Sequence, residues 1–367
     1  MRAPALDFDR RPILVFWEST RACGLACRHC RAEAMPHPAP GELDHEQSLA
    51  FIESLRAFGR PAPVLIVTGG DALMRPDLPE LVAHARSNRI PVALAPSVTP
   101  LLDDERLAGL RALGVKVASL SLDGARAATH EGIRGVEAHF EATLAALRRL
   151  RSHGFVVQVN TVAMAENVEE LPEVARLVRD AGASIWEVFF LVQVGRGVGM
   201  TELGPEEVED VCHFLYDASC HGFVVRTVEG PMFRRVAAWR EEGRPCETGP
   251  LYARLRESLV RELGEPAGRS KAQTKGTRDG KGIVFVSSTG DVYPAGFLPV
   301  VLGNVKDDPL AELYRGHPLL RDIRAARFSG RCGRCEYRDL CGGSRARAFA
   351  ASGDALGEDP ACAYVPA

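Results

Sequence analysis

Short apolar segments typical of β-strands alternate six times with amphipathic helical segments between residues 13 and 222. Strands that alternate with helices pair in parallel through right-handed crossovers, and the resulting sheet curls toward a barrel. Six such units are fewer than the eight that close a TIM barrel. We therefore predict an α/β fold, a partial (β/α)6 TIM-like barrel with functional groups at the C-terminal ends of its strands. The expected strands span residues 13–18, 63–67, 91–95, 115–122, 154–162 and 184–192, and the expected helices span residues 46–58, 77–88, 103–112, 138–153, 169–181 and 205–221.

After the predicted barrel, the composition of the chain and its predicted secondary structure change twice. Residues 264–282 contain almost no apolar side chains and hold five basic ones, which favours a mobile loop, either a solvated linker or a lid over an acidic substrate. Two strand-like runs around a Thr-Gly-Asp turn in residues 283–293 then predict a β-hairpin. We expect three parts: a barrel in residues 1–225, a linker with the basic loop in 226–282, and a small cysteine-rich hairpin and helix domain in 283–367.

Composition excludes several classes of function. The chain is 46% hydrophobic and 25% charged, which is typical of a soluble globular protein. Its formal net charge of −3 gives no basic field for nucleic acid. Acidic residues near the N-terminus stand where a signal peptide would be apolar, and no apolar run approaches the roughly 20 residues that span a bilayer. We expect a cytoplasmic protein with neither nucleic-acid nor membrane partners.

Three cysteines, Cys23, Cys27 and Cys30, follow the first expected strand in a C-x3-C-x2-C spacing. Three soft ligands around one small volume suit a [4Fe–4S] cluster whose remaining iron binds something other than the protein. A closed structural zinc site would need a fourth protein ligand. Zinc completed by His29 or His37 is the alternative reading of this loop.

Four further cysteines lie near the C-terminus, at Cys332, Cys335, Cys341 and Cys362. Four thiolates close a coordination shell, so this pattern predicts a cluster or a zinc ion with no open position. Bound metal would also stabilise a segment too small to bury a sufficient core.

The first cysteine loop resembles the motif of the radical S-adenosylmethionine (SAM) superfamily, in which the residue before the last cysteine is usually aromatic and is His29 here. The resemblance covers the whole chain because later segments match in order. Residues 68–71 resemble the family's GGE segment beside the SAM amino group, with aspartate in place of glutamate. Residues 119–124 resemble the S-x-D-G element near the ribose and carboxylate. Residues 189–197 resemble the F-F-L-V-P-x-G-R-G segment of members that act on heme precursors, with Gln193 in place of proline.

The resemblance implies a set of SAM contacts that also make chemical sense. A zwitterionic amino acid needs an anion near its ammonium group and donors near its carboxylate. Asp71 is expected to supply the anion, and Arg196 or Arg134 the donors. No side chain is singled out as a catalytic hydrogen donor or acceptor. The implied cofactor-binding residues are Gly69, Gly70, Asp71, Ser97, Ser121, Asp123, Arg134, Asn160 and Arg196.

The C-terminal cysteines resemble the SPASM/twitch domains, which hold auxiliary [4Fe–4S] clusters, and most closely the tails of radical enzymes of the alternative heme pathways. Two positions depart from that pattern. Ser344 stands where relatives commonly read C-G-G-C, and Ala295 stands where many read V-Y-P-C-G. Because both departures affect the auxiliary cluster nearer the active site, we expect one radical-generating cluster and one auxiliary cluster.

These resemblances imply a radical SAM enzyme, in which reductive cleavage of SAM yields a 5′-deoxyadenosyl radical that abstracts hydrogen from a substrate. Two substrate classes are carried forward: a side chain of a tetrapyrrole heme precursor, and a ribosomally made peptide that is oxidised, crosslinked or epimerised. A flavodoxin- or ferredoxin-type electron donor is implied. A non-catalytic zinc or redox-sensing metalloprotein is the alternative of a different class.

Overall fold

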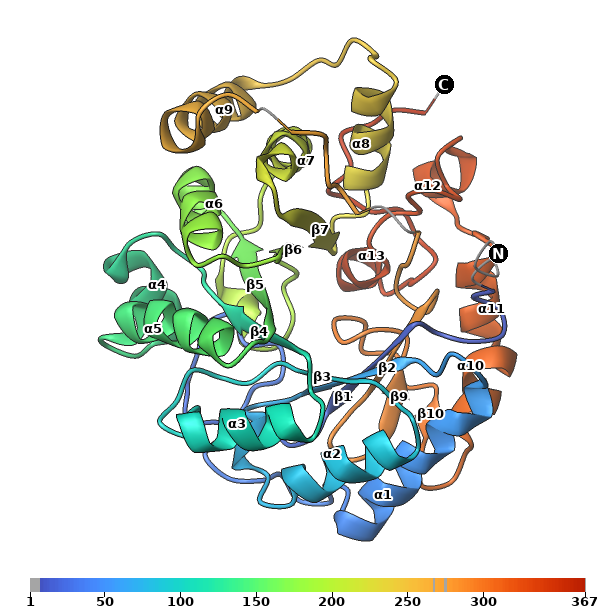
Figure 1. Ribbon diagram of the computed structural model, residues 1–367. Helices are drawn as coiled ribbons and strands as arrows, with labels where there is room; N and C mark the ends of the chain where they lie inside the picture. The colour runs from blue at the N-terminus through green and yellow to red at the C-terminus, as the bar shows by residue number, and fades with distance from the viewer. Residues whose placement is uncertain (1–6, 267, 274–275, 367) are drawn as a thin grey trace, which may run out of the picture.

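The computed structural model describes residues 7–266, 268–273 and 276–366, and its strands form one curved sheet with helices around the outside (Figure 1). The sheet order is β10-β9-β8-β1-β2-β3-β4-β5-β6-β7. The strands are β1 (Leu14–Glu18), β2 (Val64–Thr68), β3 (Val92–Leu94), β4 (Val117–Ser121), β5 (Val156–Ala163), β6 (Ile185–Phe190), β7 (Val224–Val228), β8 (Ile283–Val286), β9 (Asp291–Tyr293) and β10 (Gly303–Asn304). The α-helices are α1 (His45–Ser54), α2 (Leu78–Ser87), α3 (Asp104–Ala112), α4 (Ala127–Arg134), α5 (His139–Ser152), α6 (Leu171–Asp180), α7 (Pro205–Ala218), α8 (Phe233–Glu241), α9 (Pro250–Leu263), α10 (Leu310–Gly316), α11 (Pro318–Arg324), α12 (Gly330–Arg334) and α13 (Arg345–Ser352).

Strands β1 to β7 pair in parallel with their neighbours, which confirms the predicted partial barrel. Side chains alternate along each strand between the helical layer and the barrel interior. Val157 and Val159 of β5 are buried in the main hydrophobic core, whereas Asn160 lines a cavity inside the barrel. This alternation places polar side chains of the strands in the interior of the barrel.

Strand β7 adds a seventh parallel strand that was not predicted. It pairs with β6 at the edge of the sheet. Arg226 and Thr227 interrupt its apolar pattern, and most of its side chains are only half-buried. The sequence of β7 therefore lacks the continuous apolar signal that identified the other strands.

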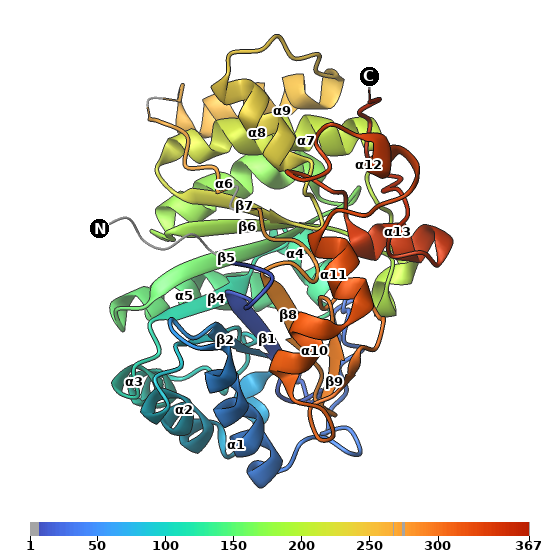
Figure 2. The same ribbon diagram turned by 90° about the vertical axis from the view of Figure 1, so that its right-hand side faces the viewer.

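The predicted hairpin is confirmed, because β8 and β9 pair antiparallel. However, β8 also pairs in parallel with β1, so the hairpin extends the barrel sheet (Figure 2). The proposed boundary at residue 283 thus falls within a continuous sheet, and the three-part division stays a prediction.

The segment between the barrel and the hairpin contains more structure than expected. Helices α8 and α9 lie in it, and both pack against α7. In the expected mobile loop, residues 271–273 run beside the edge strand β7, where the backbone N–H of Gln273 donates to Val225. Arg278 and Asp279 are buried. These contacts are long-range, so the polar composition gave no sign of them; residues 267, 274 and 275 of this loop lie outside the described residues.

None of the helices in the described part of the chain combines the length and apolar character needed to cross a membrane.

Candidate active site and metal centres

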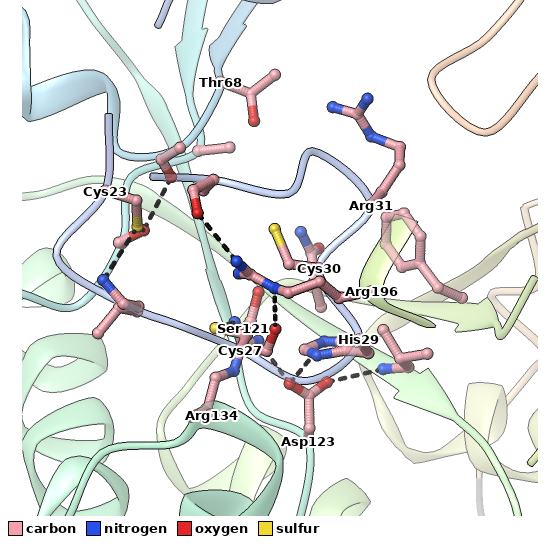
Figure 3. A pocket seen from close by; sticks show the side chains of 18 of the residues that line it. Cys23, Cys27, His29, Cys30, Arg31, Thr68, Ser121, Asp123, Arg134 and Arg196 are labelled. Carbon is pink, nitrogen blue, oxygen red and sulfur yellow. Dashed lines mark hydrogen bonds and ion pairs between the residues drawn. The ribbon is translucent and has the colours of Figure 1, made fainter. Parts of the chain in front are cut away.

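A cavity of about 240 Å³ lies at the C-terminal ends of the barrel strands (Figure 3). The loop after β1 brings the three N-terminal cysteines to it, and the ends of β2 to β6 supply most of the remaining wall. Among the residues singled out from the sequence, those that line the cavity are Cys23, Cys27, Cys30, Gly69, Gly70, Ser97, Ser121, Asp123, Arg134, Asn160 and Arg196. Asp71 does not line it.

The cysteine loop is held in place mainly by Arg196. Its guanidinium donates from Nε to the carbonyl of Cys27 at 2.9 Å and from Nη1 to the carbonyl of Ala34 at 2.9 Å. The backbone N–H of Cys23 donates to Met35 at 2.8 Å. Burial raises the pKa of the Cys23 thiol. Arg196 therefore stabilises the conformation of the loop and also forms part of the cavity wall.

Asp71 has a different position from the one expected of an ammonium partner. Its carboxylate is fully buried and accepts hydrogen bonds from Leu73 N, Ser97 N and Thr99 Oγ1, at 3.1, 3.3 and 2.9 Å. Burial raises the pKa of this carboxyl. Asp71 thus joins the loops after β2 and β3. Its direct contact with SAM stays a prediction.

Two glycines allow the end of β2 to approach the start of the cysteine loop. A Cβ on Gly69 would lie 2.3 Å from the carbonyl oxygen of Thr20, and one on Gly70 would lie 2.2 Å from that of Ala22. Gly69 also has a φ of +145°, which disfavours other residues. The Gly-Gly pair is therefore required by contact between two backbone segments.

Asp123 is the centre of a buried charge cluster (Figure 3). Its Oδ2 lies 2.5 Å from Arg134 Nη2 and 3.4 Å from His29 Nε2, while its Oδ1 accepts from Val162 N at 2.9 Å. Burial alone would raise the pKa of Asp123, but Arg134 and His29 outweigh it and hold the pKa well below its usual range. Arg134 also donates to Cys27 Sγ at 3.6 Å. Asp123 therefore fixes Arg134 against the cysteine loop.

The four C-terminal cysteines line a second, smaller cavity of about 30 Å³ between α8, α12 and the C-terminal segment. Cys341 is buried, and the other three are half-buried. Burial raises the pKa of Cys341 to about 12, so its thiol is protonated unless a metal replaces the proton. The four cysteines thus line one cavity, and their role as metal ligands stays a prediction.

The two positions that lack cysteine are both buried. Ser344 is the N-cap of α13, where its Oγ accepts from Arg347 N at 2.9 Å and also contacts the carboxyl of Glu229. Ala295 follows the β8–β9 hairpin and is 6% exposed. Ser344 therefore has a structural role in this chain.

Comparison with known proteins decides the family. The model of the radical SAM superfamily matches residues 17–178, and that of an iron–sulfur cluster-binding domain, SPASM, matches residues 278–336. An AdoMet-dependent heme synthase of Methanosarcina barkeri is 36% identical over 97% of this chain and 97% of its own length. This chain belongs to the radical SAM superfamily. A second AdoMet-dependent heme synthase, from Nitratidesulfovibrio vulgaris, is 35% identical over 96% of this chain and 92% of its own length.

The solved structures agree on the fold. Streptococcus suis SuiB bound to the precursor peptide SuiA matches with a TM-score of 0.68 at 14% identity, covering 97% of this chain and 76% of that chain. The family confirms that this radical SAM protein is an enzyme whose cofactors are SAM and a [4Fe–4S] cluster, with an auxiliary iron–sulfur cluster in its SPASM region. The non-catalytic alternative is set aside.

The side chains around the larger cavity fit a carboxylate-bearing cofactor. Arg134 Nε, Arg196 Nη2 and His29 Nδ1 are buried and have no hydrogen-bond partner among the described residues. All three residues line the cavity. Unpartnered buried polar atoms are costly. The two guanidinium donors beside three thiols suit the carboxylate of an amino acid bound at an open iron.

The geometry of the cysteines also fits clusters. No three His, Cys, Asp or Glu side chains in the described residues come together closely enough to hold one metal ion. Ligands of a single zinc ion, each about 2.3 Å from the metal, lie roughly 4 Å from one another. A cluster of several irons separates its ligands further, so four cysteines around one cavity are compatible with it.

Sequence reasoning missed a polar network behind Asn160. Gln158 Nε2 donates to Asn160 Oδ1 at 2.7 Å and to Glu187 Oε2 at 2.9 Å, and Gln158 Oε1 accepts from Arg226 Nη2 at 2.8 Å. Because arginine only donates and carboxylate only accepts, the orientation of the Gln158 amide is determined. Asn160 Oδ1 is thereby occupied, which leaves Asn160 Nδ2 as the donor available to the cavity. The network joins three strands, so it is visible only once their register is known.

We expect Gln158→Met to weaken SAM binding roughly fivefold, because loss of one orienting hydrogen bond costs about 1 kcal/mol. Calorimetric titration of the reconstituted enzyme with SAM measures this. Gln47→Met, which alters an N-terminal hydrogen bond of α1 outside the cavity, is the control and should bind SAM normally. Equal affinities of the two variants would contradict the orienting role.

Proposed function

We propose that this radical SAM enzyme acts on a side chain of a tetrapyrrole heme precursor. The observation that carries the proposal is the similarity over nearly the full length to two AdoMet-dependent heme synthases. When bound, the [4Fe–4S] cluster supplies the electron that cleaves SAM, and the resulting 5′-deoxyadenosyl radical removes a hydrogen atom from the substrate.

The protein's own part is to bind and orient. We assign Cys23, Cys27 and Cys30 as ligands of the radical cluster, and Arg134 and Arg196 as donors to the SAM carboxylate. Backbone at residues 68–70 and the polar ends of β3 to β5 form the remaining wall. These groups hold the reacting atoms together and keep water away from them.

Aromatic side chains in the wall of the cavity support a planar substrate. Phe189 at the end of β6 and Phe297 after the hairpin both line it, with ring centroids 6.1 Å apart. Arg31 also lines the cavity and lies over the ring of Phe285 at 4.5 Å. The Arg31 guanidinium is already paired with Glu18 at 2.8 Å, so it is the aromatic surface that suits a planar macrocycle.

A ribosomal peptide is the second candidate substrate. SuiB, whose structure holds a precursor peptide, shares this fold, but its 14% identity supports the fold alone.

We assign Cys332, Cys335, Cys341 and Cys362 as ligands of the auxiliary cluster. The proposal includes a flavodoxin- or ferredoxin-type electron donor and a cytoplasmic location, where thiols stay reduced.

Deuterium transfer tests the proposed substrate. The reconstituted enzyme, SAM and dithionite are incubated with an iron tetrapyrrole whose propionate side chains carry deuterium. We expect deuterium in the released 5′-deoxyadenosine and a change of mass in the tetrapyrrole, because hydrogen is abstracted from the side chain. The same tetrapyrrole with unlabelled side chains is the control. Release of unlabelled 5′-deoxyadenosine only, with the tetrapyrrole unchanged, would contradict the proposal.

A further inference from the structure

Two buried arginines flank the four-cysteine site. Arg345, the first residue of α13, is completely buried, and Arg278, which precedes β8, is 5% exposed. Arg345 Nη2 donates to Cys332 Sγ at 3.6 Å. Both guanidiniums pack on the ring of Phe328, at 4.4 Å for Arg345 and 5.4 Å for Arg278, which fixes their positions.

Within the described part of the chain, the hydrogen-bond partners of the two guanidiniums are backbone carbonyls and the Cys332 thiol. Arg278 donates to the carbonyls of Arg338 and Asp339, at 2.9 and 2.7 Å. Arg345 donates to the carbonyls of residues 343, 355 and 357. Neither guanidinium forms an ion pair with a carboxylate within residues 7–266, 268–273 and 276–366. Arg235, by contrast, lines the cysteine cavity itself and is paired with Glu209 at 2.7 Å.

The buried carboxyls around the site are engaged elsewhere. Asp359 lines the cysteine cavity, but its carboxylate is paired with Arg347 at 3.4 Å. Asp279 and Glu229 lie beyond Ser344, in a separate small cavity. Burial, and for Glu229 also the charge of Asp279, raises the pKa of both carboxyls, so the pair loses negative charge. Burial and the like charge of Arg234 lower the pKa of Arg278 to about 10. Among the described residues, Arg278 and Arg345 therefore have no carboxylate partner within 4.0 Å.

Burying a cation without a counterion is strongly unfavourable, so an anion bound at this site would stabilise both arginines. A [4Fe–4S] cluster with four thiolate ligands carries an overall charge of about −2 when oxidised and about −3 when reduced by one electron. Neighbouring cations and donors to sulfur favour the more negative state.

We propose that Arg278 and Arg345 stabilise the reduced form of the auxiliary cluster and thereby prepare it to accept one electron. The electron would come from the flavodoxin- or ferredoxin-type donor of the proposed function. The cluster core would go from 2+ to 1+, its four thiolate ligands would stay bound, and no proton would move. The auxiliary cluster then serves electron transfer as well as structural support. The inference rests on the proposed ligation by the four cysteines.

The test measures the reduction potential of the auxiliary cluster alone. Cys23, Cys27 and Cys30 are replaced by Ala in the full chain, which is reconstituted and titrated anaerobically with dithionite while the cluster is followed by EPR. We expect Arg345→Gln and Arg278→Gln each to make reduction roughly tenfold less favourable, a shift of about −59 mV for a one-electron couple. Arg345→Lys, which keeps the charge, should retain most of the original potential.

Arg324→Gln is the matched control. Arg324 is also a buried arginine with carbonyl partners, but its charge is paired with Asp9. Unchanged potentials in both Gln variants, or an equal shift in Arg324→Gln, would overturn the proposal. If Arg345→Gln assembles no cluster, assembly in Arg345→Lys supports the charge argument, and failure of both variants overturns it.

Iron content separates failure of this inference from failure of the ligand assignment. The parent protein without the first three cysteines should hold roughly four irons. A parent that holds no iron refutes ligation by the four C-terminal cysteines, and with it the tuning role. A parent that holds the cluster confirms the ligation, whatever the arginine variants do.

Discussion

Replacing Cys27 by Ala should abolish the release of 5′-deoxyadenosine from SAM. Cys27 is buried, its sulfur accepts from Arg134 at 3.6 Å, and its carbonyl accepts from Arg196. With only two of the three thiolates left, the cluster loses a ligand that no other described cysteine is placed to replace. Chromatography of anaerobic reactions with SAM and dithionite measures the product. Iron content should also fall from roughly eight to roughly four per chain.

Two other cysteine variants make this result specific. Cys220→Ala removes a half-buried thiol whose hydrogen-bond partner is the Tyr216 carbonyl, and product release should be unchanged. Cys335→Ala should lose the auxiliary irons but keep the radical cluster. Persistent release of 5′-deoxyadenosine by the Cys27→Ala enzyme would refute the assignment of the first cluster.

The barrel could be predicted because its strands carry a strong apolar signal. The expected strand at 13–18 corresponds to Leu14–Glu18, and that at 63–67 corresponds to Val64–Thr68. Asp44 and Asp103 immediately precede helices α1 and α3, and each accepts a backbone N–H three residues later. Such signals are local, so the sequence alone displays them.

Other parts of the fold depend on contacts between distant segments. Strand β7 is interrupted by Arg226 and owes its place to pairing with β6. Residues 271–273 are ordered by the edge of β7, and Arg278 is buried by carbonyl groups of residues 338 and 339. A polar composition predicts a mobile loop there, because burial of an arginine is uncommon and needs partners that composition does not reveal.

In the candidate site, too, some features follow from local sequence signals and others depend on contacts between distant segments. The cysteines and the strand-end residues were found because motif spacing and strand ends place them. The hydrogen bonds of Asp71 to Ser97 and Thr99 were not predicted, because these two residues belong to the loop after the next strand. The relay from Glu187 through Gln158 to Asn160 crosses neighbouring strands. Neither arrangement can be inferred without the three-dimensional register.

Asp123→Asn should lower the free energy of unfolding by about 3–5 kcal/mol, because it leaves Arg134 buried without its counterion. Asparagine keeps the shape of the side chain and a hydrogen bond to Val162 N, so the loss is mainly one of charge. Arg134 has a side chain only 11% exposed, which gives little access to water as a substitute partner. Urea unfolding followed by circular dichroism measures the change.

The control for this variant is Glu169→Gln, which breaks an exposed ion pair with Arg254 and should lower the free energy of unfolding by less than about 1 kcal/mol.

The contribution of Asp123 to the free energy of unfolding also has a defined pH dependence. Arg134 and His29 hold its folded-state pKa below the unfolded value of about 3.9, so its contribution is complete above that pH and is lost as the pH falls further. The stability difference between wild type and Asp123→Asn should therefore be constant from pH 6 to 8 and shrink below about pH 4. A difference that grows in acid would contradict the role of Asp123 as the counterion of Arg134.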